Sequence, residues 1–303
     1  MQQDNRCRAH YLIGGIHLVL DYPLSLLVCS KLGGFSCFSY KGVPVDSPGD
    51  INIELFSSNE APEASAAGDE LCRLTLPVGQ TLGSEIYHLQ VKNSGTAAGE
   101  LRADLSKSNN KVFCEIRGDL SPGSLAFALW IVYAFYGIGK MRVPIHSSAV
   151  VCNNFALLFL GESGIGKSTQ ASLWLRHIAA TKALNDDSPV LSIGADGKTY
   201  VYGSPWSGKG RVYLNESYPV AAFVRLEQGS DNHIVRVHKL EAFRALFPSF
   251  PPQFMQFDHF EECACNIISV LIGSIPVYKL RCLPCVDAAI LTHSAVFNNK
   301  EGV

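Results

Sequence analysis

The stretch "PIHSSAVVCNNFALLFLGESGIGKS", residues 144–168, decides the fold that we expect for this chain. Within it, two runs rich in β-branched and apolar residues, 147–152 and 155–160, flank the pair Asn153-Asn154. Asparagine tolerates the positive φ that a two-residue hairpin turn requires. The stretch therefore predicts a β-hairpin that leads directly into a glycine-rich loop.

This hairpin has a consequence for one histidine. Turning the chain at the two asparagines places His146 opposite Gly161, the first residue of the loop. A histidine that lies a strand's length away in the sequence is thereby brought beside the loop. A purely structural role for His146, as a hydrogen-bonded residue, is the alternative.

The loop follows the pattern G-x-x-x-x-G-K-[ST] over residues 161–168. In such a loop the glycines let backbone N–H groups point at phosphates, the lysine reaches the β- and γ-phosphates, and the hydroxyl holds Mg²⁺. An apolar run precedes it and a helix-like segment follows, whose positive N-terminal end also favours an anion. The predicted nucleotide-binding residues are Gly161, Glu162, Ser163, Gly164, Ile165, Gly166, Lys167, Ser168 and Thr169.

Two adjacent carboxylates, Asp186 and Asp187, follow the loop, its helix and a short run that can end a strand. One carboxylate in this place completes a Mg²⁺ shell together with Ser168. The other can accept a proton from an acceptor hydroxyl. The sequence does not say which aspartate takes which role. As an alternative, "NDDSP" (185–189) is a polar turn, because all of its residue types favour turns.

The segment "SPWSGKGRV", residues 204–212, combines glycines with an aromatic ring and two cations. Trp206 offers a stacking face, and Lys209 and Arg211 offer positive charge. This mixture predicts a mobile lid that closes over the γ-phosphate or an anionic acceptor. A plain surface hairpin with a solvated basic tip is the alternative.

The chain as a whole predicts an α/β protein with two regions. Residues 1–120 contain short, partly alternating runs separated by Gly, Pro, Ser and Asn, which is typical of a small, mainly antiparallel β domain. We expect that domain to serve in docking or dimerisation, so a homo-oligomer is compatible with the sequence. Residues 121–303 carry the motifs and alternate helices with strands in a mixed sheet.

The composition indicates which classes of partner and which cellular compartment to expect. With 303 residues, a net charge of −2 and no run of like charges, the chain gives no electrostatic reason to expect nucleic acid or an anionic membrane. The uncharged run 124–139 has 16 residues, short of the roughly 20 that span a bilayer, so we expect a buried helix. The first residues lack the layout of a secretory signal, which predicts a cytoplasmic protein.

Ten cysteines in such a protein are expected to stay reduced. Cys263-Ala-Cys265 and Cys282-Leu-Pro-Cys285 together could form a four-thiolate zinc site. The first pair lies in a helix-like stretch, where residues two apart face different ways. We therefore expect core cysteines.

His146, "GESGIGKS" and the pair Asp186-Asp187, in this order and spacing, resemble the HPr serine kinase/phosphorylase family and its phosphoenolpyruvate-carboxykinase-like relatives. The resemblance implies a phosphate loop between a hairpin and a helix. It implies that Lys167 and Ser168 bind phosphates and Mg²⁺, that the aspartates supply metal ligation and acid/base chemistry, and that His146 lines the site.

The resemblance covers about residues 145–240 and has two departures. The glycine-rich signature that follows the aspartates in HPr kinases is replaced by "YGSPWSGKGRVYLNE", which resembles a divergent branch of uncharacterised HPr-kinase-like proteins found beside peptide- or cofactor-biosynthesis genes. The N-terminal region shows no relation to the HPr kinase N-terminal domain. HPr is therefore not implied as the acceptor.

Together these features predict a Mg-ATP-dependent kinase that phosphorylates a hydroxyl, such as that of serine, on a protein, peptide or small molecule. The sequence leaves the donor open between ATP, GTP and pyrophosphate. A nucleotide-gated binding protein without acceptor chemistry is the alternative, and an enzyme of the carboxykinase type is a third option.

Overall fold

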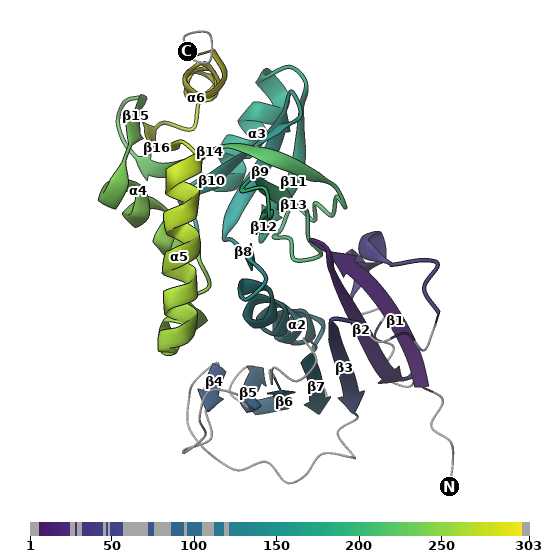
Figure 1. The fold of residues 1–303 in the computed structure, drawn as a ribbon. Coiled ribbons are helices and arrows are strands. Elements are labelled where there is room, and N and C mark those ends of the chain that lie inside the picture. The colour runs from purple at the N-terminus through teal and green to yellow at the C-terminus, as the bar shows by residue number, and fades with distance from the viewer. Residues whose placement is uncertain are drawn as a thin grey trace, which may run out of the picture. The chain divides into compact units, whose positions relative to one another are not determined.

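The computed structural model describes residues 6–24, 28, 32–44, 47, 49–56, 72–75, 86–93, 96–104, 112–117 and 121–298. The chain divides into two compact units, residues 1–136 and 137–303 (Figure 1). Both combine sheet and helix, so the chain belongs to the predicted mixed α/β class.

The first unit contains a seven-stranded sheet in the order β1-β2-β3-β7-β6-β5-β4. The pairs β2–β3 and β3–β7 are parallel, and the other neighbours are antiparallel. The sheet is thus mainly antiparallel. Its strands are β1 (Arg6–Ile13), β2 (Ile16–Pro23), β3 (Ile51–Phe56), β4 (Cys72–Thr75), β5 (Ile86–Asn93), β6 (Thr96–Asp104) and β7 (Val112–Arg117), with a 3₁₀ turn η2 (Gly33–Phe38).

The apolar run after residue 120 forms α2 (Pro122–Ile138). Proline at its first position has no N–H to leave unpaired, and the hydroxyl of Ser121 accepts the backbone N–H of Ser124 at 3.2 Å. The hydroxyl of the buried Tyr133 donates to the carbonyl of Ile13 at 2.9 Å, which ties the helix to the first hairpin. None of the helices in the described part of the chain is long and apolar enough to cross a membrane.

The second unit is built on a nine-stranded mixed sheet. The order is β11-β9-β10-β14-β13-β12-β8, while β16 pairs with β14 and β15 pairs with β16; only β10–β14 and β14–β16 are parallel. Its strands are β8 (Arg142–Pro144), β9 (Ser147–Cys152), β10 (Phe155–Leu160), β11 (Thr181–Asp187), β12 (Val190–Ile193), β13 (Thr199–Tyr202), β14 (Ser217–Gln228), β15 (His233–Val237) and β16 (Val277–Cys282). Its helices are α3 (Lys167–His177), α4 (Lys239–Leu246), α5 (Asp258–Ser274) and α6 (Val286–Phe297), with 3₁₀ turns η4 (Phe247–Ser249) and η5 (Pro252–Gln256).

The hairpin predicted at the two asparagines is confirmed. Asn153 and Asn154 have φ of 49° and 64°, and β9 pairs with β10 from Cys152 opposite Phe155 to Ser147 opposite Leu160. The strands end where the glycine-rich loop begins, so the register places His146 at the level of the loop.

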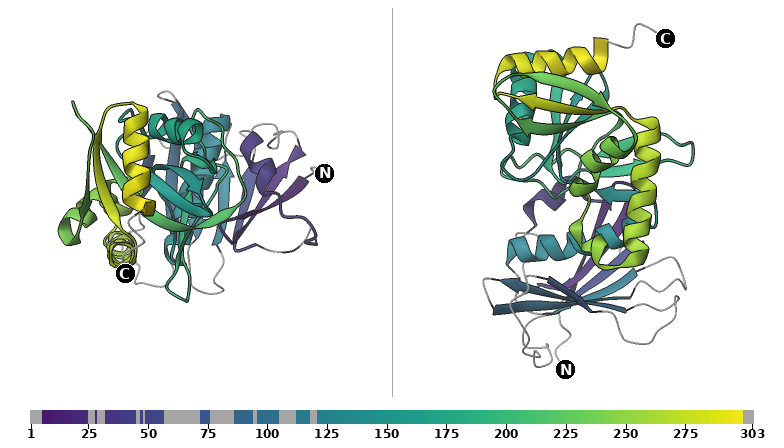
Figure 2. Two further views of the ribbon diagram at one scale, coloured as in Figure 1. Left: turned by 90° about the horizontal axis from the view of Figure 1, so that it is seen from above. Right: turned by 90° about the vertical axis from the view of Figure 1, so that its left-hand side faces the viewer.

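The core of the second unit fixes both sides of that loop. Helices α3 and α6 lie side by side against the sheet (Figures 1 and 2). Trp174 of α3 is fully buried and contacts Phe159 of β10, His293 and Phe297, with ring centroids 5.6 to 6.2 Å apart. Because β10 and α3 share this core, the loop that joins them is held at both ends.

Candidate functional site

The loop between β10 and α3 curls because three of its glycines adopt positive φ. Gly161, Gly164 and Gly166 have φ of 150°, 83° and 114°. At Gly161 a Cβ atom would also lie 2.6 Å from Cγ2 of Ile165. A side chain at these positions would strain the backbone, so the glycines of the motif are needed for the curl itself.

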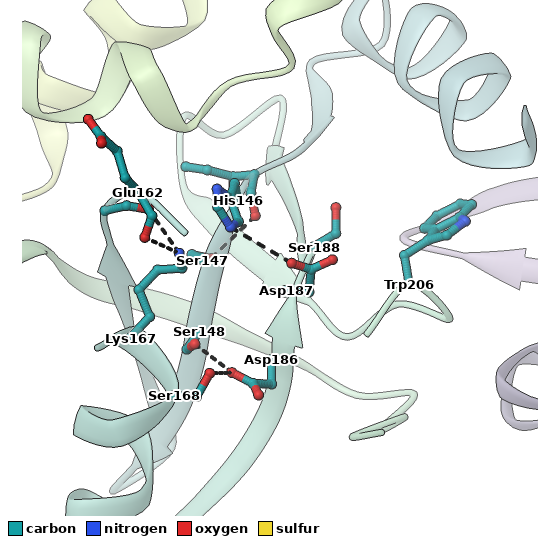
Figure 3. Close-up of polar contacts among 12 residues, drawn as sticks. His146, Ser147, Ser148, Glu162, Lys167, Ser168, Asp186, Asp187, Ser188 and Trp206 are labelled. Atoms are coloured by element: carbon teal, nitrogen blue, oxygen red, sulfur yellow. Dashed lines mark hydrogen bonds and ion pairs between the residues drawn. The ribbon is translucent and has the colours of Figure 1, made fainter. Parts of the chain in front are cut away.

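Lys167, at the start of α3, folds back over the loop. Its Nζ donates to the carbonyls of Gly161 at 2.9 Å and Glu162 at 3.1 Å (Figure 3). The side chain is buried, with 8% of the residue exposed. Burial lowers the pKa of Lys167 and nearby Arg225 adds to this, while the two aspartates oppose it. The lysine is therefore a poorly hydrated cation that is held against the first two residues of the loop.

Asp186 joins three elements at the end of β11. Its Oδ1 accepts the hydroxyl of Ser148 in β9 at 2.6 Å and that of Ser168 in α3 at 2.9 Å (Figure 3). The strand pairing explains the first contact, because Asp186 is registered opposite Ser148. The structure thus brings together the serine and one carboxylate that the sequence assigned to a metal.

Asp187 faces His146 instead. Its Oδ1 lies 3.8 Å from Nε2 of the imidazole, and the backbone N–H of His146 is anchored to the carbonyl of Ser249 at 2.8 Å. The Asp187 side chain is half-exposed. Partial desolvation raises its pKa, while Lys167 opposes this and Asp186 adds to it. Burial lowers the pKa of His146, helped by Lys167 and Arg225. The neutral imidazole is favoured, and the carboxylate has an increased affinity for a proton.

Asn185, which the sequence reasoning missed, positions the aspartates. Its buried Oδ1 accepts the backbone N–H groups of Asp187 at 3.0 Å and Ser188 at 2.9 Å. Its Nδ2 donates to the carbonyls of Ser204 at 3.1 Å and Trp206 at 3.2 Å. The signal was present, since asparagine commonly bonds to the backbone two residues on. The alternative of a polar turn at "NDDSP" is wrong, because Asn185 and the two aspartates are the last residues of strand β11.

Arg225 was also missed. It lies in β14 opposite Leu160, the last residue of β10, and its guanidinium is 3.9 Å from Oε1 of Glu162. Its side chain is only 15% exposed. A charged residue inside the apolar run "AAFVRLEQ" was the available signal. Together with Lys167 it gives the loop a second cation.

The segment 204–212 differs from the expected lid. The N–H of Gly208 donates to the carbonyl of Asp186 at 2.9 Å, and Ser207 forms a bridge with Asp187. A Cβ atom at Gly208 would lie 2.6 Å from that carbonyl, and one at Gly210 would lie 3.0 Å from Oδ2 of Asp186. These glycines therefore permit close packing on the carboxylate strand.

The three residues expected to act from that segment have different surroundings. Trp206 is buried, with 7% exposed, so little of the predicted stacking face is open to a ligand. Lys209 and Arg211 are exposed, and Arg211 has a positive φ of 49°. Only the two cations are available to a ligand in this arrangement.

No protein-family model matches the chain, and no curated protein matches it. Among solved structures, the chain has a weak similarity to the one in "Structure of the Hpr(Ser) kinase/phosphatase from Coxiella burnetii". The TM-score is 0.31 at 13% sequence identity, and the match covers 52% of this chain and 95% of that chain. A likeness this remote says nothing about the chemistry of this chain.

Proposed function

We propose that the second unit is a phosphotransferase that moves the γ-phosphoryl group of a nucleoside triphosphate, ATP in the first place, to a hydroxyl group. The convergence on one loop of Lys167, Ser168 and the two aspartates carries this proposal. The loop pattern, the strand before it and the helix after it are what phosphate binding by backbone N–H groups requires.

The donor set fits Mg²⁺. Ser168 and Asp186 offer a hydroxyl and a carboxylate whose oxygens lie 2.9 Å apart, and Mg²⁺ prefers oxygen ligands of this kind. When bound, the ion neutralises charge on the transferred phosphoryl group. Lys167 and Arg225 would hold the negative charge of the phosphates from the loop side.

Asp187 is the proposed proton acceptor. Its pKa is raised, which suits a general base, and it is not engaged by the serines that hold Asp186. In the reaction the acceptor hydroxyl gives its proton to the Asp187 carboxylate and its oxygen forms the new bond to phosphorus. The bond from phosphorus to the β,γ-bridging oxygen breaks, and the nucleoside diphosphate leaves. His146 would keep the carboxylate in place.

The acceptor is proposed only by class, as a protein, peptide or small molecule with a free hydroxyl. We propose that the sheet of the first unit docks that acceptor or a second copy of the chain. GTP and pyrophosphate are the alternative donors, because a loop of this pattern binds phosphates and no base.

The test uses γ-labelled ATP, Mg²⁺, the purified protein and fractions of an extract from its own source cells. A labelled product that Lys167→Ala no longer forms is expected, and isolating it names the acceptor. Asp187→Asn should bind the nucleotide but transfer nothing, whereas Asp186→Asn should lose Mg²⁺-dependent binding.

Three other outcomes would contradict the proposal. Tight, Mg²⁺-dependent ATP binding without any labelled product would favour a nucleotide-gated binding protein. Release of carbon dioxide coupled to transfer would favour the carboxykinase type. Failure to bind any nucleotide or pyrophosphate would refute the phosphate loop.

A further inference from the structure

Two cysteines lie on one turn in the second unit, between β16 and α6. Cys282 is the last residue of β16, and Cys285 occupies the N-cap position of the 12-residue helix α6. The sequence favoured core cysteines, but both thiols are partly exposed. They are separated by Leu283 and Pro284, which is the spacing of dithiols that undergo redox exchange.

The turn is held in shape by hydrogen bonds. The N–H of Cys285 donates to the carbonyl of Leu283 at 2.9 Å, and the N–H of Leu283 donates to Oδ1 of Asn232 at 2.9 Å. The chain folds back on itself between the two cysteines. The two cysteines therefore flank a single bend of the chain, three residues apart.

Each sulfur accepts a hydrogen bond from a side-chain amide group. Nδ2 of Asn232 donates to Sγ of Cys285 at 3.2 Å, and Nε2 of Gln170 in α3 donates to Sγ of Cys282 at 3.3 Å. Gln170 is almost fully buried, and its Oε1 has no hydrogen-bond partner among the described residues. Two independent side chains, from different elements, thus direct donors at the pair.

The two thiols are chemically unequal. The amide of Asn232, followed by backbone N–H groups at the start of α6, lowers the pKa of Cys285. Burial raises the pKa of Cys282, although Gln170 opposes this. One partner is an accessible sulfur favoured as thiolate, and the other is a more sheltered thiol beside it. This is the division between an attacking and a resolving cysteine.

Cys263 and Cys265 in α5 provide the contrast. Burial raises the pKa of both, with Glu262 adding to the shift at Cys263 and Glu261 at Cys265. These cysteines are also partly exposed. Partial exposure alone therefore does not account for the lowered pKa of Cys285.

We propose that Cys282 and Cys285 are a redox-active dithiol that exchanges with a small-molecule disulfide of the glutathione class. The Cys285 thiolate attacks the disulfide, forms a mixed disulfide and releases one thiolate. The Cys282 thiol then loses its proton and attacks Sγ of Cys285, which forms the Cys282–Cys285 disulfide and releases the second thiolate. The small disulfide is reduced to two thiols as the protein dithiol is oxidised.

The first experiment measures alkylation of the reduced, full-length chain by iodoacetamide at pH 7, cysteine by cysteine, by peptide mass spectrometry. Cys285 should react several-fold faster than Cys263. Asn232→Asp keeps an acceptor for the N–H of Leu283 but replaces the donor to Cys285 with a negative charge. It should slow the alkylation of Cys285 by about tenfold for each unit by which the pKa of this thiol rises, and leave the alkylation of Cys263 unchanged.

The second experiment treats the reduced chain with glutathione disulfide and maps the products. The peptide that holds both cysteines should lose two hydrogen atoms. Cys282→Ser should instead accumulate a glutathione adduct on Cys285, and Cys285→Ser should form neither product. Cys263→Ser is the matched control and should behave as the unmodified protein does.

The proposal is overturned if Cys285 reacts no faster than Cys263, or if no Cys282–Cys285 disulfide forms while the far-ultraviolet circular dichroism shows a folded chain. It is also overturned if Cys282→Ser carries no adduct on Cys285. None of these readouts uses a nucleotide, so they are independent of the phosphotransfer proposal.

Discussion

Asp186 and Asp187 are neighbours in the sequence but have different surroundings. Consecutive residues of a strand point to opposite faces, so one carboxylate meets Ser148 and Ser168 while the other meets His146. The sequence predicted that the pair belongs beside the loop. It could not divide the roles, because that division depends on which face of β11 is turned toward α3.

The raised pKa of Asp187 predicts that Asp187→Asn stabilises the fold at neutral pH. Between the ordinary and the raised pKa the native state holds more protons than the unfolded state, so the wild type loses stability as pH rises through this window. Asparagine carries no such cost. The gain should be at most about 1 kcal/mol, because a half-exposed group is screened by solvent.

Urea unfolding of both proteins at a series of pH values measures this effect. The difference in the free energy of unfolding should shrink as pH falls toward the ordinary pKa of an aspartate. A variant that is less stable at neutral pH would instead show that Lys167 makes the charged Asp187 favourable overall.

Asn185 predicts a second effect at the residue scale. Replacing it by alanine leaves buried backbone groups on both neighbouring segments without their partners. Asn185→Ala should destabilise the fold by about 2–4 kcal/mol. Asn185→Asp keeps the acceptor for the N–H groups of Asp187 and Ser188 but loses the donors. Its loss in the free energy of unfolding should therefore be smaller than that of Asn185→Ala. Equal, small losses in chemical denaturation of the two variants would contradict this role.

Among the elements, those fixed by local turn chemistry were predictable. The hairpin at Asn153-Asn154 and the one between β12 and β13, where Gly197 has φ of 74°, both follow from their turn residues. The parallel pairing of β10 with β14 joins distant parts of the chain, and no local pattern encodes it. For this reason Arg225 could not be placed beside the loop from the sequence.

The segment 204–212 shows the same limit, because its glycines predict flexibility whereas the structure uses them for close packing. Gly208→Ala should push the backbone off β11 and destabilise the fold by about 1–3 kcal/mol. It should also weaken Mg²⁺-dependent nucleotide binding, because the displaced carbonyl belongs to Asp186. Thermal unfolding and calorimetric titration measure the two effects.

Gly273→Ala is the matched control. A Cβ atom there meets nothing within 4 Å, and the residue lies in helix α5. Alanine is the better helix former, so this variant should be neutral or more stable by up to about 1 kcal/mol, with unchanged nucleotide binding. If both alanines were equally harmless, the close packing on β11 would not matter to the site.

For the whole molecule, the chain has two compact units, and the loop, the aspartates, His146 and Arg225 all lie in the second one. The sequence placed a boundary after residue 120, whereas the units divide at residues 136 and 137. The helix between these points, α2, is apolar along most of its length, so its sequence does not reveal which core it joins.

This division predicts that residues 137–303 fold and bind Mg-ATP without the first unit, with a dissociation constant within about threefold of the full chain. The physical reason is that every proposed ligand group and its hydrogen-bond partners lie within that unit. Cooperative thermal unfolding and calorimetric titration of the fragment check this. A folded fragment that binds no nucleotide would show that the first unit contributes to the site.

The two-sided pairing of β10 also orders events in time. Along one edge β10 pairs with β9, which it follows after a two-residue turn. Along the other edge it pairs in parallel with β14, which comes later in the chain, after α3, β11, β12 and β13. Hairpins close in microseconds, whereas parallel pairing must wait for a long loop to close. During synthesis the glycine-rich loop therefore leaves the ribosome well before the strand that braces it, and the nascent chain is complete at this site only once β14 has emerged.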